Sequence, residues 1–288
     1  GENWRQLLPA AAAVEILCTA VLIQDDIIDR DELRRGQPSM HAQYVELAKK
    51  LYPHDHQHHG ESYGICVADV GIFLSQRVLA RAAQDMETMR AVQEFYAREF
   101  VILALSEMLD VHQTISPQPV SLEETLEMYR YKTARYTFAT PLVMGGLYAH
   151  AEPEQRQAVE HIGELIGLIF QIKDDELGLF GTEAQTGKPV ISDVREGKRT
   201  PYYLAARQLA DAKGQELLDT WYGSAQITAK ELEIIRTLII DSGAKKQVDE
   251  LVDTLATQVA ALIKNAPLRE SACQTLDAIL QMNVQRSK

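Results

Sequence analysis

Apolar residues recur along the chain at the spacing of helix faces, and breaks rich in Gly, Pro and polar residues separate the periodic runs. The first apolar run extends through residues 7–28, where Pro9 is tolerated because it falls in the first turn. The other expected helices cover residues 41–51, 63–83, 85–113, 203–218, 229–242, 245–264 and 268–284, and one more begins at Pro153. No stretch of useful length alternates with the period of a strand. The pattern therefore predicts an all-α protein, a single-domain helical bundle of about ten or more helices around a central cavity.

Three local signals refine the middle of the chain. Ser121 followed by Glu124 matches a capping box and predicts a helix start. Pro141, inside the helical pattern that follows, predicts a kink and a freed backbone carbonyl. The histidine-rich stretch 54–59, which lies between Pro and Gly, is interpreted as an exposed loop, with a Zn²⁺ site as the less favoured alternative.

Composition narrows the function classes. The net charge of −12 argues against nucleic-acid binding, which needs a basic surface, so an anionic substrate must be held by local basic residues and metal. Cys18, Cys66 and Cys273 stand apart in apolar contexts and are expected to be small buried residues of a reduced protein. No signal peptide is recognised, and the apolar run 14–23 is too short to span a membrane. These features predict a cytoplasmic protein without a transmembrane segment.

Acidic residues close the first apolar run. Asp25, Asp26 and Asp29 lie within four positions, so helical spacing projects their side chains to one side. Carboxylates this close to one another repel, and the negative C-terminal end of the helix dipole adds to the repulsion. A hard cation bound between them would relieve it. Oxygen ligands without nearby Cys or His suit Mg²⁺, and Arg34 and Arg35 just beyond are suited to phosphate oxygens. A solvated acidic loop is the alternative for this cluster taken alone.

A second acidic pair repeats the arrangement. The apolar segment 162–172 leads into Asp174 and Asp175, and a Gly-rich loop with Lys188 and Lys198 follows. Two acidic sites that face each other would hold several Mg²⁺ ions with a diphosphate between them, where the metal acts as Lewis acid and template for a leaving diphosphate. The loop is long enough to close over a substrate as a lid.

This pair of motifs resembles that of the trans-isoprenyl diphosphate synthases, the polyprenyl synthetase family that includes farnesyl and geranylgeranyl diphosphate synthases. The family's D-D-x-x-D followed by R-R-G reads DDIID and RRG here, and its second motif reads FQIKDDELG with GKPVISDVREGKRT after it. The family's K-T pair corresponds to Lys132-Thr133. The similarity spans nearly the whole chain, and the joint pattern is highly specific. The resemblance implies the isoprenoid synthase type I fold, usually as a homodimer.

The resemblance also implies a reaction, the addition of isopentenyl diphosphate to an allylic diphosphate. Several Mg²⁺ ions, three with substrate bound, would hold the allylic diphosphate while its C–O bond ionises; isopentenyl diphosphate would attack the cation, and a proton would leave with the diphosphate. The implied metal ligands are Asp25, Asp26, Asp29, Asp174 and Asp175. The implied catalytic residues are Asp25, Asp26, Asp29, Lys132, Thr133, Gln171 and Lys198. The implied substrate-binding residues are Arg34, Arg35, Lys132, Gln171, Lys188 and Lys198.

Two departures from the family pattern stand out. Gly178 occupies the place of the last Asp of the second motif, and activity is expected to survive because the first Asp is the more important ligand. The basic segment and the His that normally bind isopentenyl diphosphate upstream of the first motif are missing from the 24 residues that precede Asp25. Residues 1–288 are therefore expected to form one polyprenyl synthetase domain that lacks its N-terminal helices.

Product length is expected to depend on the helix before Asp25, whose side chains one turn back line the pocket for the growing chain in this family. Leu17, Ala20 and Val21 put no aromatic side chain there, and Phe73 on a later helix is a candidate for the pocket floor. Geranylgeranyl diphosphate (C20) is the expected product, with farnesyl diphosphate or a product of C25 or more as alternatives.

Other protein classes fit less well. A class I terpene cyclase carries Asn/Asp, Ser/Thr and Glu at spaced positions in its second motif, which DDELG followed by a GK loop does not match. A di-iron carboxylate bundle needs Glu-x-x-His pairs, and no His here has Glu three residues before it. A non-catalytic subunit of a heteromeric prenyl synthase usually has degraded aspartate motifs, whereas DDIID and RRG are intact.

Overall fold

The computed structural model describes residues 4–82, 85–116, 118–182, 185 and 190–286. Helices dominate these residues, so the all-α prediction is confirmed. Backbone contacts divide the chain into two compact units, Gly1–Phe95 with Leu147–Ala149, and Tyr96–Gly146 with His150–Lys288. The expectation of one domain stays a prediction, and each unit is described by itself.

The first unit is built on the pairing of α1 with α3. Its elements are η1 (Trp4–Leu7, a 3₁₀ turn), α1 (Leu8–Ile28), β1 (Leu33–Arg34), β2 (Gln37–Pro38), α2 (Met40–Leu51), α3 (His56–Leu79) and the start of α4 (Met86–Ile115). Small residues let α1 and α3 approach closely, because a Cβ on Gly71 would lie 2.8 Å from the Cβ of Ala20. This contact fixes the helix that carries the first acidic motif.

A tight hairpin follows α1 and carries the two arginines of the first motif. Strands β1 and β2 pair antiparallel, with Arg34 opposite Gln37. Arg35 and Gly36 form the turn with φ of 53° and 72°, the pair of positive φ values that a two-residue hairpin of type I′ requires. Gly36 adopts this conformation without steric cost, whereas Arg35 does so under strain. The hairpin turns the chain back, so that Arg34 returns to the end of α1.

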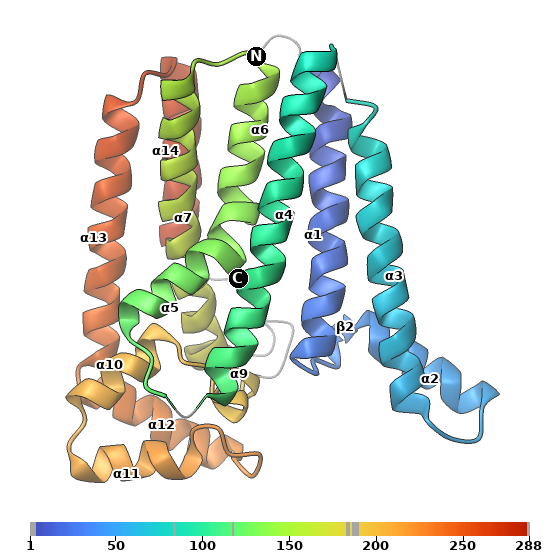
Figure 1. The fold of residues 1–288 in the computed structure, drawn as a ribbon. Helices are drawn as coiled ribbons and strands as arrows, with labels where there is room; N and C mark the ends of the chain where they lie inside the picture. The colour runs from blue at the N-terminus through green and yellow to red at the C-terminus, as the bar shows by residue number, and fades with distance from the viewer. Residues whose placement is uncertain (1–3, 83–84, 117, 183–184, 186–189, 287–288) are drawn as a thin grey trace. The chain divides into compact units, whose positions relative to one another are not determined.

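The second unit is organised around α7 (Pro153–Phe180). Its other elements are the rest of α4, α5 (Leu122–Tyr129), η2 (Arg130–Ala139, a π-helix), α6 (Thr140–Tyr148), α9 (Ser192–Glu196), α10 (Pro201–Leu209), α11 (Ala212–Trp221), α12 (Ala229–Asp241), α13 (Ala244–Asn265) and α14 (Glu270–Val284). Helix α7 packs against η2, α13 and α14, and Figure 1 shows α7, α13 and α14 side by side. Ile162, Ile166 and Ile169 are fully buried at helical spacing, which makes α7 the core helix of this unit.

Glycines on α7 allow η2 to lie unusually close. A Cβ on Gly163 would stand 2.7 Å from the Cα of Ala139, and a Cβ on Gly167 would stand 2.3 Å from the Cα of Ala134. Real side chains do not tolerate such approaches, so this contact holds only with glycine on α7. The K-T segment is thereby pressed against the helix that carries the second acidic motif.

Several expectations need correction. Helix α3 begins at His56, so most of the histidine-rich stretch is helical and not a loop, although its side chains are largely exposed as expected. The segment 203–218 is two helices, because Asp211 caps a new helix by accepting from the backbone N–H of Gly214. All three cysteines were expected to be buried, but Cys66 is exposed, and Cys18 and Cys273 are only partly buried.

Among the described residues, one segment, Trp4–Ile28, has the length and apolar composition of a helix that crosses a membrane. Core helices of soluble proteins pass the same test. Ala13, Leu17 and Ala20 of this segment are buried, and its last turn contains Asp25 and Asp26.

Candidate active site

The first acidic motif occupies the last turns of α1, where the two neighbouring aspartates have different environments. The side chain of Asp26 is 4% exposed, whereas that of Asp25 is 22% exposed. Arg34 donates from Nε to Oδ1 of Asp26 at 2.7 Å and from Nη2 to Oδ2 of Asp25 at 3.1 Å. Burial raises the pKa of the Asp26 carboxyl, and the hydrogen bond from Arg34 opposes that shift. Asp26 is therefore a structural anchor for Arg34, while Asp25 keeps carboxylate surface for a ligand.

The hairpin gives Arg34 and Arg35 different surroundings. Burial alone would lower the pKa of Arg34, but its hydrogen bond to Asp26 and the charges of Asp25 and Asp31 raise it, so Arg34 stays protonated. Arg35 is exposed at the tip of the hairpin. Arg34 is thus already paired with the aspartates when no ligand is bound, whereas the guanidinium of Arg35 is accessible to an anionic group of a substrate.

The second acidic motif, near the end of α7, also pairs one buried aspartate with one partly exposed aspartate. Asp175 is buried, and it accepts from Tyr129 Oη at 2.5 Å and from Gln171 Nε2 at 3.0 Å. Burial raises its pKa well above the ordinary value, with the two hydrogen bonds acting in the opposite direction. Asp174, one residue earlier, has a side chain that is 48% exposed.

The K-T segment lies beside this motif. Thr133 donates from Oγ1 to Oε1 of Gln171 at 2.8 Å, which extends the chain from Tyr129 through Asp175 and Gln171. The segment is a π-helix, in which the backbone N–H of Thr140 donates to the carbonyl of Arg135, five residues back. Pro141, which lacks an N–H, follows at once, so the chain departs from α-helical geometry just before the proline, and the expected kink stays a prediction.

Lys132 is held by two carboxylates from α4. Its Nζ lies 3.1 Å from Oε1 of Glu107 and 2.5 Å from Oδ2 of Asp110. Its side chain is mostly buried, which makes these contacts stronger than those of a surface lysine. Sequence reasoning did not pair Lys132 with Asp110, although the three-residue spacing of Glu107 and Asp110 places both on one helix face.

The chain terminus also reaches the second motif. Arg286 donates from Nη2 to Oδ1 of Asp174 at 2.8 Å, and its guanidinium carbon lies 3.9 Å from the ring centroid of Phe170. The sequence alone did not assign Arg286 to this site. The cation–π contact and the ion pair together explain why Arg286 docks.

The loop after α7 brings a second lysine into the same unit. Lys198 lies 3.4 Å from Oε2 of Glu196 and 3.9 Å from Oδ1 of Asp193. A Cβ on Gly178 would stand 2.3 Å from Oδ2 of Asp193, so the carboxylate of Asp193 fills the space beside the glycine that replaces the motif's last aspartate. Lys188 lies outside the described residues.

The donor set suits Mg²⁺. The part of the chain that the structure describes holds no group of three or more His, Cys, Asp or Glu residues able to enclose a metal ion. Magnesium does not need such a cage, because it keeps several waters and is usually bound by one or two carboxylates together with substrate phosphates. Asp25 and Asp174 meet that requirement, since each is partly exposed and carries only oxygen donors.

The residues expected to control product length differ in how deeply they are buried. Leu17 and Ala20 are buried, and Ala20 packs against Gly71 of α3. Val21 is partly buried, whereas the side chain of Phe73 is 75% exposed. In the described part of its unit, Phe73 therefore lies at the surface.

Changing Tyr129 to Phe is expected to lower the free energy of unfolding by about 1–3 kcal/mol, because Oδ2 of the buried Asp175 loses its donor. The matched control is Tyr202→Phe. Tyr202 Oη is buried without a hydrogen-bond partner among the described residues, so its removal should leave stability unchanged or raise it. Urea unfolding of both variants measures the difference, and equal losses would contradict the role assigned to Tyr129.

Known proteins resemble this chain along most of its length. The sequence profile of the polyprenyl synthetase family matches residues 1–239. A short chain isoprenyl diphosphate synthase of Methanocaldococcus jannaschii is 31% identical over 233 residues, which cover 81% of this chain and 65% of that protein. A geranylgeranyl diphosphate synthase of Saccharolobus solfataricus is 28% identical, over 100% of this chain and 82% of that protein. The crystal structure of geranylgeranyl pyrophosphate synthase from Corynebacterium glutamicum, complexed with isoprenyl diphosphate and magnesium, matches with a TM-score of 0.91 at 28% identity, over 98% of this chain and 79% of that one.

Proposed function

This chain belongs to the polyprenyl synthetase family, and from that premise we propose that it is a trans-prenyltransferase of the cytoplasm, which joins isopentenyl diphosphate to an allylic diphosphate. One observation carries the proposal. In both acidic motifs the second aspartate is buried and hydrogen-bonded, which leaves the first aspartate, Asp25 or Asp174, partly exposed beside basic side chains. That arrangement suits a metal-bound diphosphate better than it suits a solvated loop.

The proposal assigns metal binding to Asp25, Asp29 and Asp174, with Asp26 and Asp175 holding the motifs in place. Mg²⁺, as several ions and three with substrate, would supply positive charge to the leaving diphosphate. Arg34, Lys132 and Lys198, assisted by Lys188, would bind the diphosphate of the allylic substrate. Arg35 would bind isopentenyl diphosphate, to which its exposed position at the hairpin tip is suited.

The proposed reaction needs no nucleophilic side chain. The C–O bond of the allylic substrate breaks, and its electron pair leaves with the diphosphate. The double bond of isopentenyl diphosphate attacks the cation, and the departing diphosphate accepts the proton that restores a double bond. Thr133 Oγ1 and Gln171 Oε1 carry partial negative charge, and their mutual hydrogen bond fixes their position for stabilising the cation.

A product assay tests this function. The protein is incubated with Mg²⁺, labelled isopentenyl diphosphate and, in turn, dimethylallyl, geranyl or farnesyl diphosphate, with Asp25→Ala as the inactive control. We expect a Mg²⁺-dependent product of one main length, which Asp25→Ala fails to make. A folded protein that condenses no primer would exclude the synthase function and favour a non-catalytic subunit of a heteromeric prenyl synthase.

We expect geranylgeranyl diphosphate (C20) as the main product, and Val21→Phe to shorten it to C15. Val21 is partly buried one turn before the acids, so an added ring would fill space that the growing chain needs. Ala20 is a poorer choice, because its Cβ already contacts α3 at Gly71. The dephosphorylated alcohols are sized by chromatography, with Val21→Ala as the control that keeps the longer product. A variant Val21→Phe that still makes C20 would place the length limit elsewhere.

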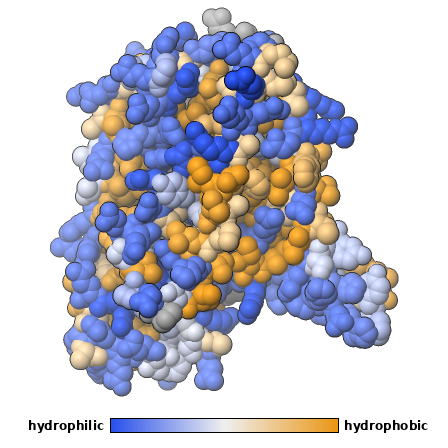
Figure 2. All heavy atoms as spheres, in the orientation of Figure 1, coloured by the Kyte–Doolittle hydropathy of each residue, from blue (hydrophilic) through white to orange (hydrophobic). Residues whose placement is uncertain are grey.

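We also propose a homodimer. Exposed apolar side chains follow α4 at helical spacing, among them Val101, Leu105, Met108 and Ile115, and Figure 2 shows hydrophobic atoms at the surface along this helix. A monomer rarely exposes such a stripe. Leu105→Glu is expected to shift the protein to monomer in sedimentation velocity, whereas Arg90→Glu on the same helix should leave the dimer intact. A wild-type protein that sediments as a monomer at micromolar concentration would refute the proposal.

A further inference from the structure

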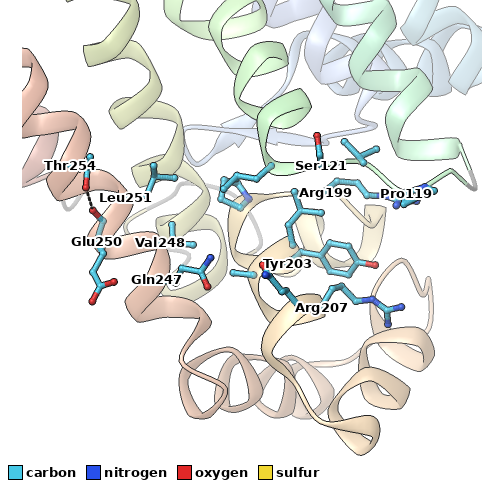
Figure 3. Close-up of a pocket in the computed structure, with 16 residues that line it drawn as sticks. Pro119, Ser121, Arg199, Tyr203, Arg207, Gln247, Val248, Glu250, Leu251 and Thr254 are labelled. Atoms are coloured by element: carbon cyan, nitrogen blue, oxygen red, sulfur yellow. Dashed lines mark hydrogen bonds between the residues drawn. The ribbon is translucent and has the colours of Figure 1, made fainter.

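A cavity of about 730 Å³ opens in the second unit, between the start of α5, helix α10 and helix α13 (Figure 3). Its lining includes none of the acidic or K-T residues of the candidate active site. The volume suits a small organic ligand rather than a single ion. No role has been assigned to this cavity by the reaction proposed above.

Charged side chains of both signs line the cavity, among them Glu250 of α13, whose carboxylate lies 3.7 Å from Lys246 Nζ. Arg199 and Arg207 both line it, and Figure 3 shows them on the side of α10. Arg199 donates to the backbone carbonyls of Ser116 at 2.9 Å and Gln118 at 3.5 Å, and it lies within ion-pair distance of no carboxylate among the described residues. Its charge is therefore oriented by neutral partners and is not neutralised by them. Arg207, by contrast, is paired with Asp219 at 2.6 Å.

The remaining lining is mainly apolar. The apolar lining includes Val248 and Leu251 of α13, Leu204 of α10, and Val120 and Leu122 at the start of α5. Val248 is buried and belongs to the core of the unit, so this side is a fixed wall. The cavity thus combines one unneutralised guanidinium with a surface for an apolar chain.

We propose that this cavity binds an anionic amphiphile, a molecule with a phosphate or diphosphate group on an apolar chain. Arg199 binds the anionic group, and the apolar chain lies against Val248, Leu251 and Leu204. The same chemistry describes a prenyl diphosphate and a simple alkyl phosphate of lipid origin, which the test below separates. The inference does not rest on the proposed function, because the cavity and the charge of Arg199 are independent of the acidic motifs.

The cavity is linked to the candidate active site through adjacent residues. Arg199 follows Lys198 in the chain, and Tyr203, which lines the cavity, stacks on Tyr222 with ring centroids 4.2 Å apart. Tyr222 donates from Oη to the carbonyl of Lys198 at 2.7 Å. A ligand that moves Arg199 or Tyr203 would therefore shift the backbone that positions Lys198.

Binding is tested with the full chain in EDTA, where metal-dependent diphosphate binding is suppressed. Isothermal titration calorimetry compares farnesyl diphosphate, dodecyl phosphate and inorganic diphosphate, each below its aggregation concentration. We expect farnesyl diphosphate to bind in EDTA, and inorganic diphosphate to bind at least about tenfold more weakly because it lacks the apolar chain. Equal affinity for dodecyl phosphate would indicate a general alkyl phosphate site, and much weaker binding would indicate a prenyl diphosphate site.

Variants on opposite walls locate the site. Arg199→Gln is expected to weaken binding at least about tenfold through loss of a charged contact. Gln247→Trp, on the α13 wall, should weaken it similarly by filling the cavity without touching Arg199. Arg269→Gln, at an exposed arginine outside the lining, is the matched control and should bind as wild type. Thermal unfolding verifies that each variant is folded.

Three outcomes would overturn the proposal. Farnesyl diphosphate does not bind in EDTA, or inorganic diphosphate binds as tightly as farnesyl diphosphate does. The third outcome is that the folded variants Arg199→Gln and Gln247→Trp bind farnesyl diphosphate with wild-type affinity. Failure of the proposed enzymatic function would be seen separately, as absence of Mg²⁺-dependent product in the condensation assay. The two results are independent, because one is an affinity without metal and the other a turnover with metal.

Discussion

Replacing Asp174 with Asn is expected to lower kcat/KM by about 10³-fold while leaving the fold intact. The side chain is 48% exposed, and an ion pair at this exposure, such as the one with Arg286, contributes little to stability. Its charge matters for the metal-bound diphosphate, where Asn keeps the shape of the carboxylate but loses its negative charge. Steady-state kinetics across a Mg²⁺ titration should show a higher Mg²⁺ requirement as well as slower turnover.

The matched control for Asp174→Asn is Asp277→Asn, at an exposed aspartate of α14. The control should retain the Mg²⁺ dependence and the rate of the wild type, since surface substitutions far from a site rarely matter. Circular dichroism of both variants excludes misfolding. If Asp174→Asn keeps kcat/KM within about threefold of the wild type, Asp174 is not a metal ligand.

Replacing Gly167 with Val is expected to destabilise the protein by at least about 3 kcal/mol, or to prevent folding. The added Cβ would lie 2.3 Å from the Cα of Ala134 and 2.4 Å from its Cβ, so α7 and η2 would have to separate. Because Thr133 precedes Ala134, the hydrogen bond between Thr133 and Gln171 would be lost with that separation. Urea unfolding, followed by circular dichroism, measures the change.

Gly145→Ala provides the matched control for this effect. Gly145 is a helical glycine in α6, and a Cβ there would meet no atom within 4 Å. The substitution should stabilise the protein by about 0.5–1 kcal/mol, because alanine favours a helix over glycine. Destabilisation by Gly145→Ala as large as that of Gly167→Val would show that glycine loss in general, and not the α7–η2 contact, is responsible.

Local sequence signals predicted the helices well, because helix caps and proline effects depend on residues only a few positions apart. The capping box at Ser121 and Glu124 is present, Pro153 starts α7, and the K-T segment departs from α-helical geometry just before Pro141. Prediction failed where a local pattern was ambiguous. The histidine-rich stretch was predicted as a loop because Pro53 and Gly60 flank it. Gly60 instead lies within a helix, where the absence of a side chain allows close packing against Val45 of α2.

The motif residues were found by spacing, but their individual environments were not. The family resemblance ranked the first aspartate above the second, but the burial of Asp175 could not be predicted, since it depends on Tyr129, which is 46 residues away. The docking of Arg286 on Asp174 likewise joins residues 112 positions apart. Such contacts depend on how helices pack, which hydrophobic periodicity does not specify.

The arginines that hold the two acidic motifs have a consequence for how the protein responds to magnesium depletion. Arg34 and Arg286 already supply positive charge to Asp25 and Asp174, so neither aspartate requires a metal ion for the chain to fold. In zinc fingers, by comparison, the free energy of metal binding is the free energy of folding, and chelators unfold them. Here a chelator should abolish the enzymatic activity without unfolding the protein, and adding Mg²⁺ back should restore the activity.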